Sequence, residues 1–112
     1  MKRNILVFID DIIEAIESIE EYIEGHTFDS FQTNKMLFDA VVRNLEVIGE
    51  ASKSIPDEIR DRYDDVPWQR MVGLRNILIH EYFGVNKQVI WKIVSENIPE
   101  IKPKMKRLLD EL

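Results

Sequence analysis

Apolar residues in the first part of the chain recur at the spacing of an α-helix. Six of the seven isoleucines within residues 5–23 follow one another at alternating intervals of four and three residues, and the acidic residues lie at other positions. A β-strand would need strict alternation, which the adjacent Asp10 and Asp11 break. The pattern therefore predicts a helix with one apolar stripe, and Gly25 is a suitable C-terminal stop.

Further segments carry the same period and are bounded by prolines, glycines or residues that cap helices. They cover about residues 31–54, a short stretch after Pro56, about residues 67–82, and the region from about residue 86 onward, which is interrupted or bent near Pro99 and Pro103. This arrangement predicts an all-α fold, an antiparallel four-helix bundle with an additional short helix. At this length we expect one domain spanning residues 1–112.

The segment of residues 67–82 is unusual because its apolar residues lie on two sides. Met71, Leu74 and Leu78 form one line, and Trp68, Val72 and Ile79 form another about a third of a turn away. One side can fill the core of the bundle. We expect a partner chain to cover the other side, and the sequence therefore predicts a homodimer.

Composition narrows the class of protein. The chain has no cysteine, which excludes a disulfide framework and a thiolate metal site. It has no uncharged apolar run near the ~18 residues that a membrane span needs, so we expect a cytoplasmic protein without a membrane partner. The net charge of −6 argues at first against nucleic acid, but seven acids and two bases in residues 1–24 account for −5 of it. We expect this acidic helix to lie away from the functional site.

Polar residues near the end of the 67–82 segment are candidates for catalysis. Asn76 and His80 are one turn apart, so the amide can hydrogen-bond the imidazole and orient it. Arg75 and His80 are about 140° apart on an ideal helix. A two-fold dimer would bring arginine and histidine side chains from both chains into one shared cleft. Neutral histidine transfers protons near pH 7 and arginine binds a phosphate that gains charge, which suffices to cleave RNA through its 2′-hydroxyl without metal. The alternative is that both residues only cap the helix end and form salt bridges there.

Other candidates stay open at this stage. Glu50 is either an ordinary surface acid or orients Arg75 across the bundle, because the preceding Gly49 lets another helix approach closely. His26, in a turn, is interpreted as an exposed loop histidine. Glu46, Glu50 and His80 lack the spacing of a metal site, and we predict none.

The end of this segment resembles the signature of HEPN domains. In that signature, here Arg75, His80 and Tyr82, four residues separate the arginine from the histidine and one residue separates the histidine from the tyrosine. The wider context resembles the HepT-type toxin ribonucleases, whose blocks occur here in order across almost the whole chain. These blocks are Val47-Ile48-Gly49-Glu50-Ala51, Val66-Pro67-Trp68, Arg75-Asn76-Ile77-Leu78-Ile79-His80-Glu81-Tyr82 and Val89-Ile90-Trp91.

The resemblance implies a HEPN-like helical homodimer whose two motif helices meet. It implies a metal-independent endoribonuclease that cleaves tRNA or mRNA as the toxin of a toxin–antitoxin pair, with Arg75 and His80 catalytic and Asn76 in support. It also implies an antitoxin similar to the minimal nucleotidyltransferase MntA, which uses ATP to transfer AMP to the motif tyrosine, here Tyr82. We expect no cofactor. The alternatives are a non-catalytic dimeric module that binds such a nucleotidyltransferase, and a metal-dependent nucleotide hydrolase.

Overall fold

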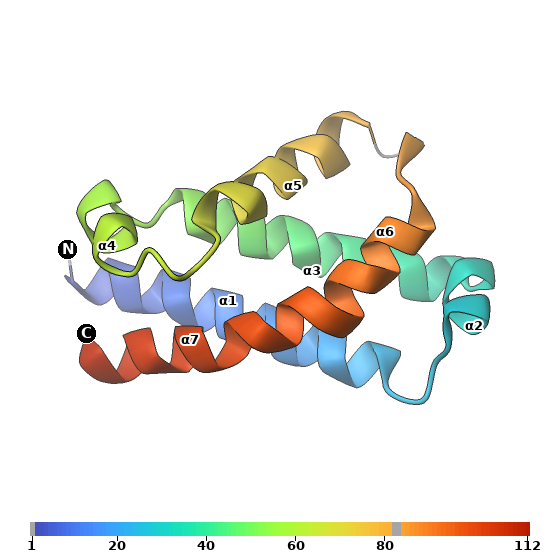
Figure 1. The fold of residues 1–112 in the computed structure, drawn as a ribbon, viewed down its shortest axis with the longest axis horizontal. Coiled ribbons are helices and arrows are strands. Elements are labelled where there is room, and N and C mark those ends of the chain that lie inside the picture. Colours follow the sequence, from blue (N-terminus) through green and yellow to red (C-terminus); the bar gives the residue numbers. More distant parts are fainter. Residues whose placement is uncertain (1, 82–83) are drawn as a thin grey trace.

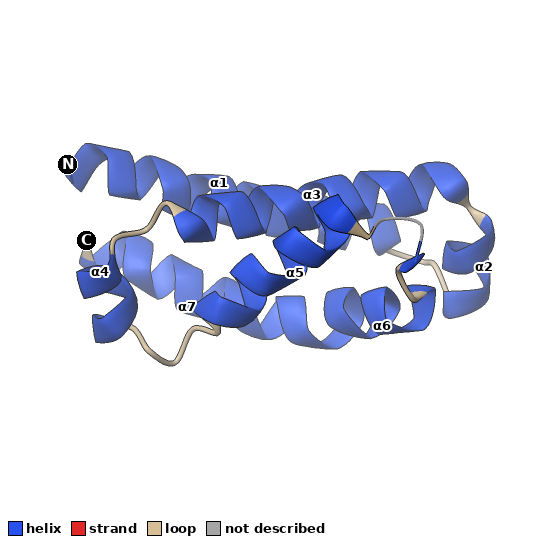
Figure 2. Ribbon diagram, turned by 90° about the horizontal axis from the view of Figure 1, so that it is seen from above, coloured by secondary structure: helices blue, strands red, loops and turns tan. Residues whose placement is uncertain are grey.

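The computed structural model describes residues 2–81 and 84–112, and this part of the chain is helical without a strand (Figures 1 and 2). The elements, in chain order, are α1 (Lys2–Ile23), α2 (Phe28–Thr33), α3 (Lys35–Lys53), α4 (Asp57–Arg62), α5 (Trp68–His80), α6 (Lys87–Lys92), the π-helical turn η2 (Ile93–Asn97) and α7 (Ile98–Glu111). The all-α prediction is confirmed. Among the described helices, none combines the length and the apolar character needed to cross a membrane.

The long helices pack side by side, and both ends of the chain lie at one end of the molecule (Figure 1). α1 packs against α3 on one side and α7 on the other, while α5 packs against the opposite side of α3. The isoleucine stripe of α1 lies in the core, and Ile9, Ile12, Ile16 and Ile19 are fully buried. Seen from above, α5 lies over the bundle between α3 and α7 (Figure 2).

The predicted helix over residues 31–54 is in fact two helices. α2 begins with a capping box at Thr27, and Asn34 ends α2 and caps α3 by accepting a hydrogen bond from the Leu37 N–H at 3.0 Å. An asparagine side chain that competes for backbone N–H groups favours such a break. The apolar period does not reveal it, because Phe31 is buried against the same core as α3.

The last helical region runs from α6 to α7 through η2 without a chain reversal. Pro99 lies in the first turn of α7, where its lack of an N–H group is tolerated, and the Ile98 N–H reaches back five residues to the Ile93 carbonyl. Pro103 stays inside α7. The predicted irregularity near Pro99 therefore takes the form of a widened turn.

Polar contacts tie α7 to its neighbours. The Lys102 ammonium lies 2.8 Å from Glu20 and 3.5 Å from Glu17 of α1, and the hydrogen bond to Glu20 raises the pKa of Lys102. Arg107 donates to both carboxylate oxygens of Asp65 at 2.9 and 3.0 Å, which raises the pKa of Arg107. This second contact holds the loop that leads into α5.

Candidate active site

α3 and α5 approach each other most closely at Gly49. A Cβ atom at this position would lie 2.2 Å from the Cβ of Arg75 and 2.7 Å from the Met71 carbonyl oxygen. Any side chain would therefore overlap the first side-chain atom of one residue and the backbone of another. Only glycine allows the two helices to cross at this distance, and the crossing fixes where Arg75 lies.

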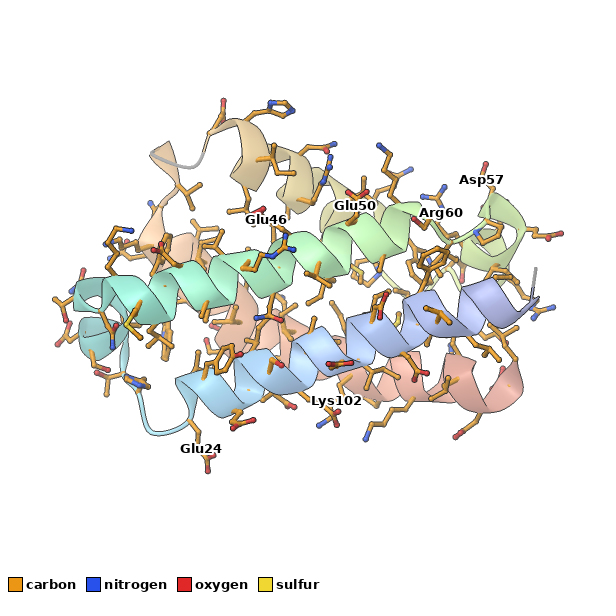
Figure 3. The ribbon with its side chains drawn as sticks, turned by 180° about the vertical axis from the view of Figure 1, so that it is seen from behind. Glu24, Glu46, Glu50, Asp57, Arg60 and Lys102 are labelled. Atoms are coloured by element: carbon orange, nitrogen blue, oxygen red, sulfur yellow. The ribbon has the colours of Figure 1, made fainter. Side chains whose placement is uncertain are left out.

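Arg75 is held by two oxygen acceptors. Its Nη2 lies 2.8 Å from the Glu50 carboxylate on α3, and its Nη1 donates to the Asn76 side-chain oxygen at 3.0 Å. The Arg75 side chain is 22% exposed, whereas that of Glu50 is 59% exposed. Figure 3 shows Glu50 on the face of α3 that lies toward α5. The guanidinium is thus oriented by its neighbours while part of it stays accessible to solvent.

The predicted hydrogen bond between Asn76 and His80 is absent from the described residues, and this expectation was wrong. The Asn76 oxygen instead accepts from Arg75. A charged guanidinium donor forms the stronger hydrogen bond, so it takes the amide oxygen in preference to a neutral imidazole.

His80 is the last residue of α5 and is exposed. Arg75 faces α3, whereas His80 lies on the outer side of α5, so one chain does not bring the two side chains together. Tyr82, the expected modification site, lies outside the described residues.

The side of α5 that the core leaves uncovered is partly apolar. Ile77 is 51% exposed and Ile79 is 45% exposed, and they lie on either side of the line through Asn76 and His80. Trp68, on the same predicted line as Ile79, is buried, and its indole N–H donates to the Tyr63 carbonyl at 3.0 Å. The loop before α5 covers Trp68, so the exposed apolar residues of α5 lie in its second half, and one of them, Ile77, is on neither of the two predicted lines.

A cavity of about 340 Å³ lies beside Arg75 between α1, α3 and α5. Arg43 and Arg75 line it together with Asp11, Glu46 and Glu50. The acidic first helix is therefore not wholly remote from Arg75, since Asp11 reaches this cavity. In contrast, the acids Glu17 and Glu20 are held against α7 by Lys102, as the expected separation requires.

A second cavity, of about 370 Å³, lies on the other side of α5, toward α7. Its lining is mostly apolar, including Leu45, Met71 and Ile98, and it contains neither Arg75 nor His80. Within residues 2–81 and 84–112, no group of three or more histidine, aspartate or glutamate side chains is placed so that it could hold a metal ion.

Comparisons with known proteins identify relatives across nearly the whole chain. The model of a family described as "Ribonuclease HepT-like" matches residues 12–108. The chain is 45% identical over 108 residues to the "Probable ribonuclease HepT" of Thermococcus cleftensis, which covers 96% of this chain and 98% of that protein. It is 46% identical over 101 residues to a "Putative RNase" of Methanocaldococcus jannaschii. This match covers 90% of this chain and 93% of that protein.

A longer relative carries more than the matched region. The "Gamma-glutamylcyclotransferase and putative RNase" of Methanocaldococcus jannaschii is 41% identical over all 112 residues, but these make up only 50% of that protein. No solved structure matches the chain significantly.

Proposed function

Because the chain belongs to the HepT-like ribonuclease family, we propose that it is an endoribonuclease in which Arg75 and His80 carry the reaction on RNA. The observation that supports this proposal best is the crossing of α3 and α5 at Gly49. It places a partly exposed guanidinium between the Glu50 carboxylate and the Asn76 amide oxygen, with a histidine one and a half turns further along the same helix. An oriented arginine of this kind suits a phosphate that gains charge in the transition state.

The proposed reaction is an attack by the RNA 2′-hydroxyl on the adjacent phosphorus. A neutral His80 imidazole takes the hydroxyl proton, the bond from phosphorus to the 5′-oxygen breaks, and the leaving oxygen takes a proton from the imidazolium of the other copy's His80. The products are a 2′,3′-cyclic phosphate and a 5′-hydroxyl. Arg75 stabilises the additional negative charge on the phosphoryl oxygens.

We propose that the active form is a homodimer. Arg75 and His80 point to different sides of α5 in one chain, so a second copy is needed to bring both types of side chain to one phosphate. The exposed Ile77 and Ile79 provide apolar area for such a contact. RNA of the tRNA or mRNA class is the proposed substrate.

Cleavage in the presence of EDTA tests the reaction directly. The purified protein is expected to cut single-stranded RNA equally well with and without EDTA, because His80 transfers the protons and Arg75 stabilises the charge in the proposed reaction. Products with cyclic phosphate and 5′-hydroxyl ends would support attack by the 2′-hydroxyl. Loss of cleavage in EDTA would favour the metal-dependent hydrolase. A stable complex with a nucleotidyltransferase and no cleavage under either condition would favour the non-catalytic module.

We further propose that the protein is the toxin of a toxin–antitoxin pair, inhibited by an MntA-like nucleotidyltransferase. The phenolic oxygen of Tyr82 would form a bond to the α-phosphorus of ATP and release pyrophosphate. The added nucleotide places bulk and negative charge where the substrate phosphate binds.

Incubation with such a transferase and ATP is expected to add the mass of AMP at Tyr82, as peptide mass spectrometry can show. Tyr22, which is 41% exposed, serves as an internal control for non-specific transfer. Tyr63 is buried, with its hydroxyl donating to Glu111 at 2.8 Å, and should stay unmodified. Transfer to Tyr22 in place of Tyr82 would contradict the assignment.

Glu50 is proposed as a positioning residue for Arg75. Glu50→Gln keeps the size of the side chain but removes its charge, and we expect kcat/KM for RNA cleavage to fall about tenfold, equivalent to about 1.4 kcal/mol. The melting temperature should barely change, because an exposed ion pair contributes little to stability. Glu46→Gln is the matched control, since Glu46 lies on the same helix (Figure 3) and lines the same cavity as Glu50. Equal activities of the two variants would show that Glu50 is an ordinary surface acid.

A further inference from the structure

The cavity of about 340 Å³ beside Arg75 has an aromatic ring and aliphatic groups on its walls as well as charges. Phe8 from α1, Val47 and Ala51 from α3, and Ile79 from α5 line it. Phe8 is only half-buried, so part of its ring is accessible to a ligand. Such walls suit a flat ring system, because the bases of single-stranded RNA stack on aromatic side chains. The volume is within the range of small-molecule sites, about 300–1,000 Å³.

Two charged side chains that line this cavity have no partner. Arg75 is held by Glu50. In the part of the chain that the structure describes, the side chains of Asp11 and Arg43 form neither a hydrogen bond nor an ion pair, and both residues are exposed. They belong to different helices, α1 and α3, so they can contact two different edges of one ligand. Glu46 is three residues from Arg43 on α3, so it lies beside that arginine and not across from it.

This combination of charges favours a neutral ligand that carries both donors and acceptors. Among the described residues, three carboxylates and two guanidinium groups line the cavity. A phosphate placed inside it would meet an excess of negative charge, and a basic side chain of a protein partner would meet the two arginines. A nucleobase avoids both penalties, because its edges carry N–H donors and ring acceptors without a net charge.

Guanine matches a carboxylate and a guanidinium better than the other three bases do. Its N1–H and its 2-amino group are adjacent donors, which fit the two oxygens of one carboxylate, and its O6 and N7 are adjacent acceptors, which fit an arginine. Adenine and cytosine each place an acceptor next to their amino group. Uracil has one N–H between two carbonyl acceptors. Two donors side by side therefore occur in guanine alone.

We propose that the cavity beside Arg75 binds a guanine base of the RNA. The Asp11 carboxylate accepts hydrogen bonds from N1–H and the 2-amino group, Arg43 donates to O6 and N7, and Phe8 stacks on the ring. This inference rests on the proposed ribonuclease and names the nucleotide that it selects. Because Arg75 lines the same cavity, the guanosine adjoins the phosphate that Arg75 binds. Asp11 and Arg43 thus determine specificity, and cleavage occurs next to guanosine.

Oligouridine RNAs that contain a single guanosine, inosine or adenosine test the base preference. Inosine differs from guanosine only by lacking the 2-amino group, so it loses one of the two hydrogen bonds to Asp11. We expect kcat/KM for cleavage beside guanosine to exceed that beside inosine or adenosine at least about tenfold, because a bidentate contact discriminates strongly between bases. Equal cleavage beside all three nucleosides would overturn the proposal.

Substitutions at the two unpartnered residues test the contacts. In Asp11→Asn, an amide with one acceptor and one NH2 donor replaces two acceptors, so a donor faces a donor of guanine. We expect the preference for guanosine over inosine to fall to about twofold or less. Arg43→Gln should reduce the preference for guanosine over adenosine about tenfold. Asp10→Asn is the matched control, because Asp10 is an exposed acid of the same helix that does not line the cavity, and it should keep the wild-type preference.

An Asp11→Asn protein with the wild-type base preference would show that this carboxylate does not contact the base. If the same variant also bound a nucleotidyltransferase more weakly, the cavity would belong to a protein partner and the proposal would be wrong.

Binding of RNA that cannot react separates the cavity from the chemistry. A 2′-O-methylated oligonucleotide has no free 2′-hydroxyl to attack the phosphorus, so its affinity is measured without cleavage. The version with guanosine is expected to bind at least about fivefold more tightly than the version with inosine, and Asp11→Asn should remove the difference. Guanosine-dependent binding without cleavage of ordinary RNA would support the base site and refute the ribonuclease. Cleavage of ordinary RNA without any preference for guanosine would refute the base site alone.

Discussion

Replacing His80 by alanine is expected to lower the rate of RNA cleavage by at least about 100-fold while leaving the fold intact. General acid–base catalysis by one side chain contributes about 10²–10⁴-fold, and the proposed reaction uses His80 for both proton transfers. The side chain is exposed at the end of α5, so its removal leaves no cavity in the core. A substitution at an exposed side chain such as this one should change the free energy of unfolding by no more than about 0.5 kcal/mol.

The measurement is single-turnover cleavage of an end-labelled RNA, with circular dichroism and sedimentation to verify helicity and dimerisation. His26→Ala is the matched control, because it removes the only other histidine of the chain. His26 lies in the turn after α1, where its Nδ1 is 3.0 Å from the Ser30 hydroxyl, far along the chain from α5. If His80→Ala and His26→Ala cleave RNA at the same rate, the catalytic assignment is wrong.

The local pattern of the sequence was sufficient to predict most helices. The spacing of the isoleucines defines the buried face of α1, and Pro56 and Pro67 stand just before α4 and α5, because proline suits a helix start. The break at Asn34 was not predicted, since the apolar period continues through it. A side-chain cap depends on one hydrogen bond, which the pattern of apolar residues does not record.

The site was predictable only in part, because its contacts join separate elements. Gly49 indicated that a helix approaches α3, but only the fold shows that Arg75 is the residue facing it. The helical spacing placed Trp68 and Ile79 on one line of α5, but it could not show that the Tyr63 carbonyl and its loop cover the indole while Ile79 stays exposed. The helical spacing likewise placed Asn76 and His80 on one side of α5. It did not show that Arg75 would donate to the Asn76 amide oxygen instead.

The glycine at the crossing of α3 and α5 should be the most sensitive position in the described fold. Gly49→Ala is expected to destabilise the protein by about 3 kcal/mol, the upper part of the range for an overpacked core. The new methyl group would lie 2.2 Å from the Arg75 Cβ and 2.7 Å from the Met71 carbonyl oxygen. Both atoms belong to, or are next to, the backbone of α5. No rotamer change can relieve the overlap, so the helices must separate.

Urea unfolding of Gly49→Ala and Gly73→Ala, compared at equal protein concentration, gives the sharpest measurement. Both substitutions remove the same backbone freedom from the unfolded chain, which alone would stabilise the protein. They differ in what the methyl group meets, which is α5 at Gly49 and open space in the single chain at Gly73. Gly49→Ala should also reduce cleavage, because separating the helices moves Arg75 away from Glu50. A Gly49→Ala protein as stable as the wild type would show that α3 and α5 do not cross this closely.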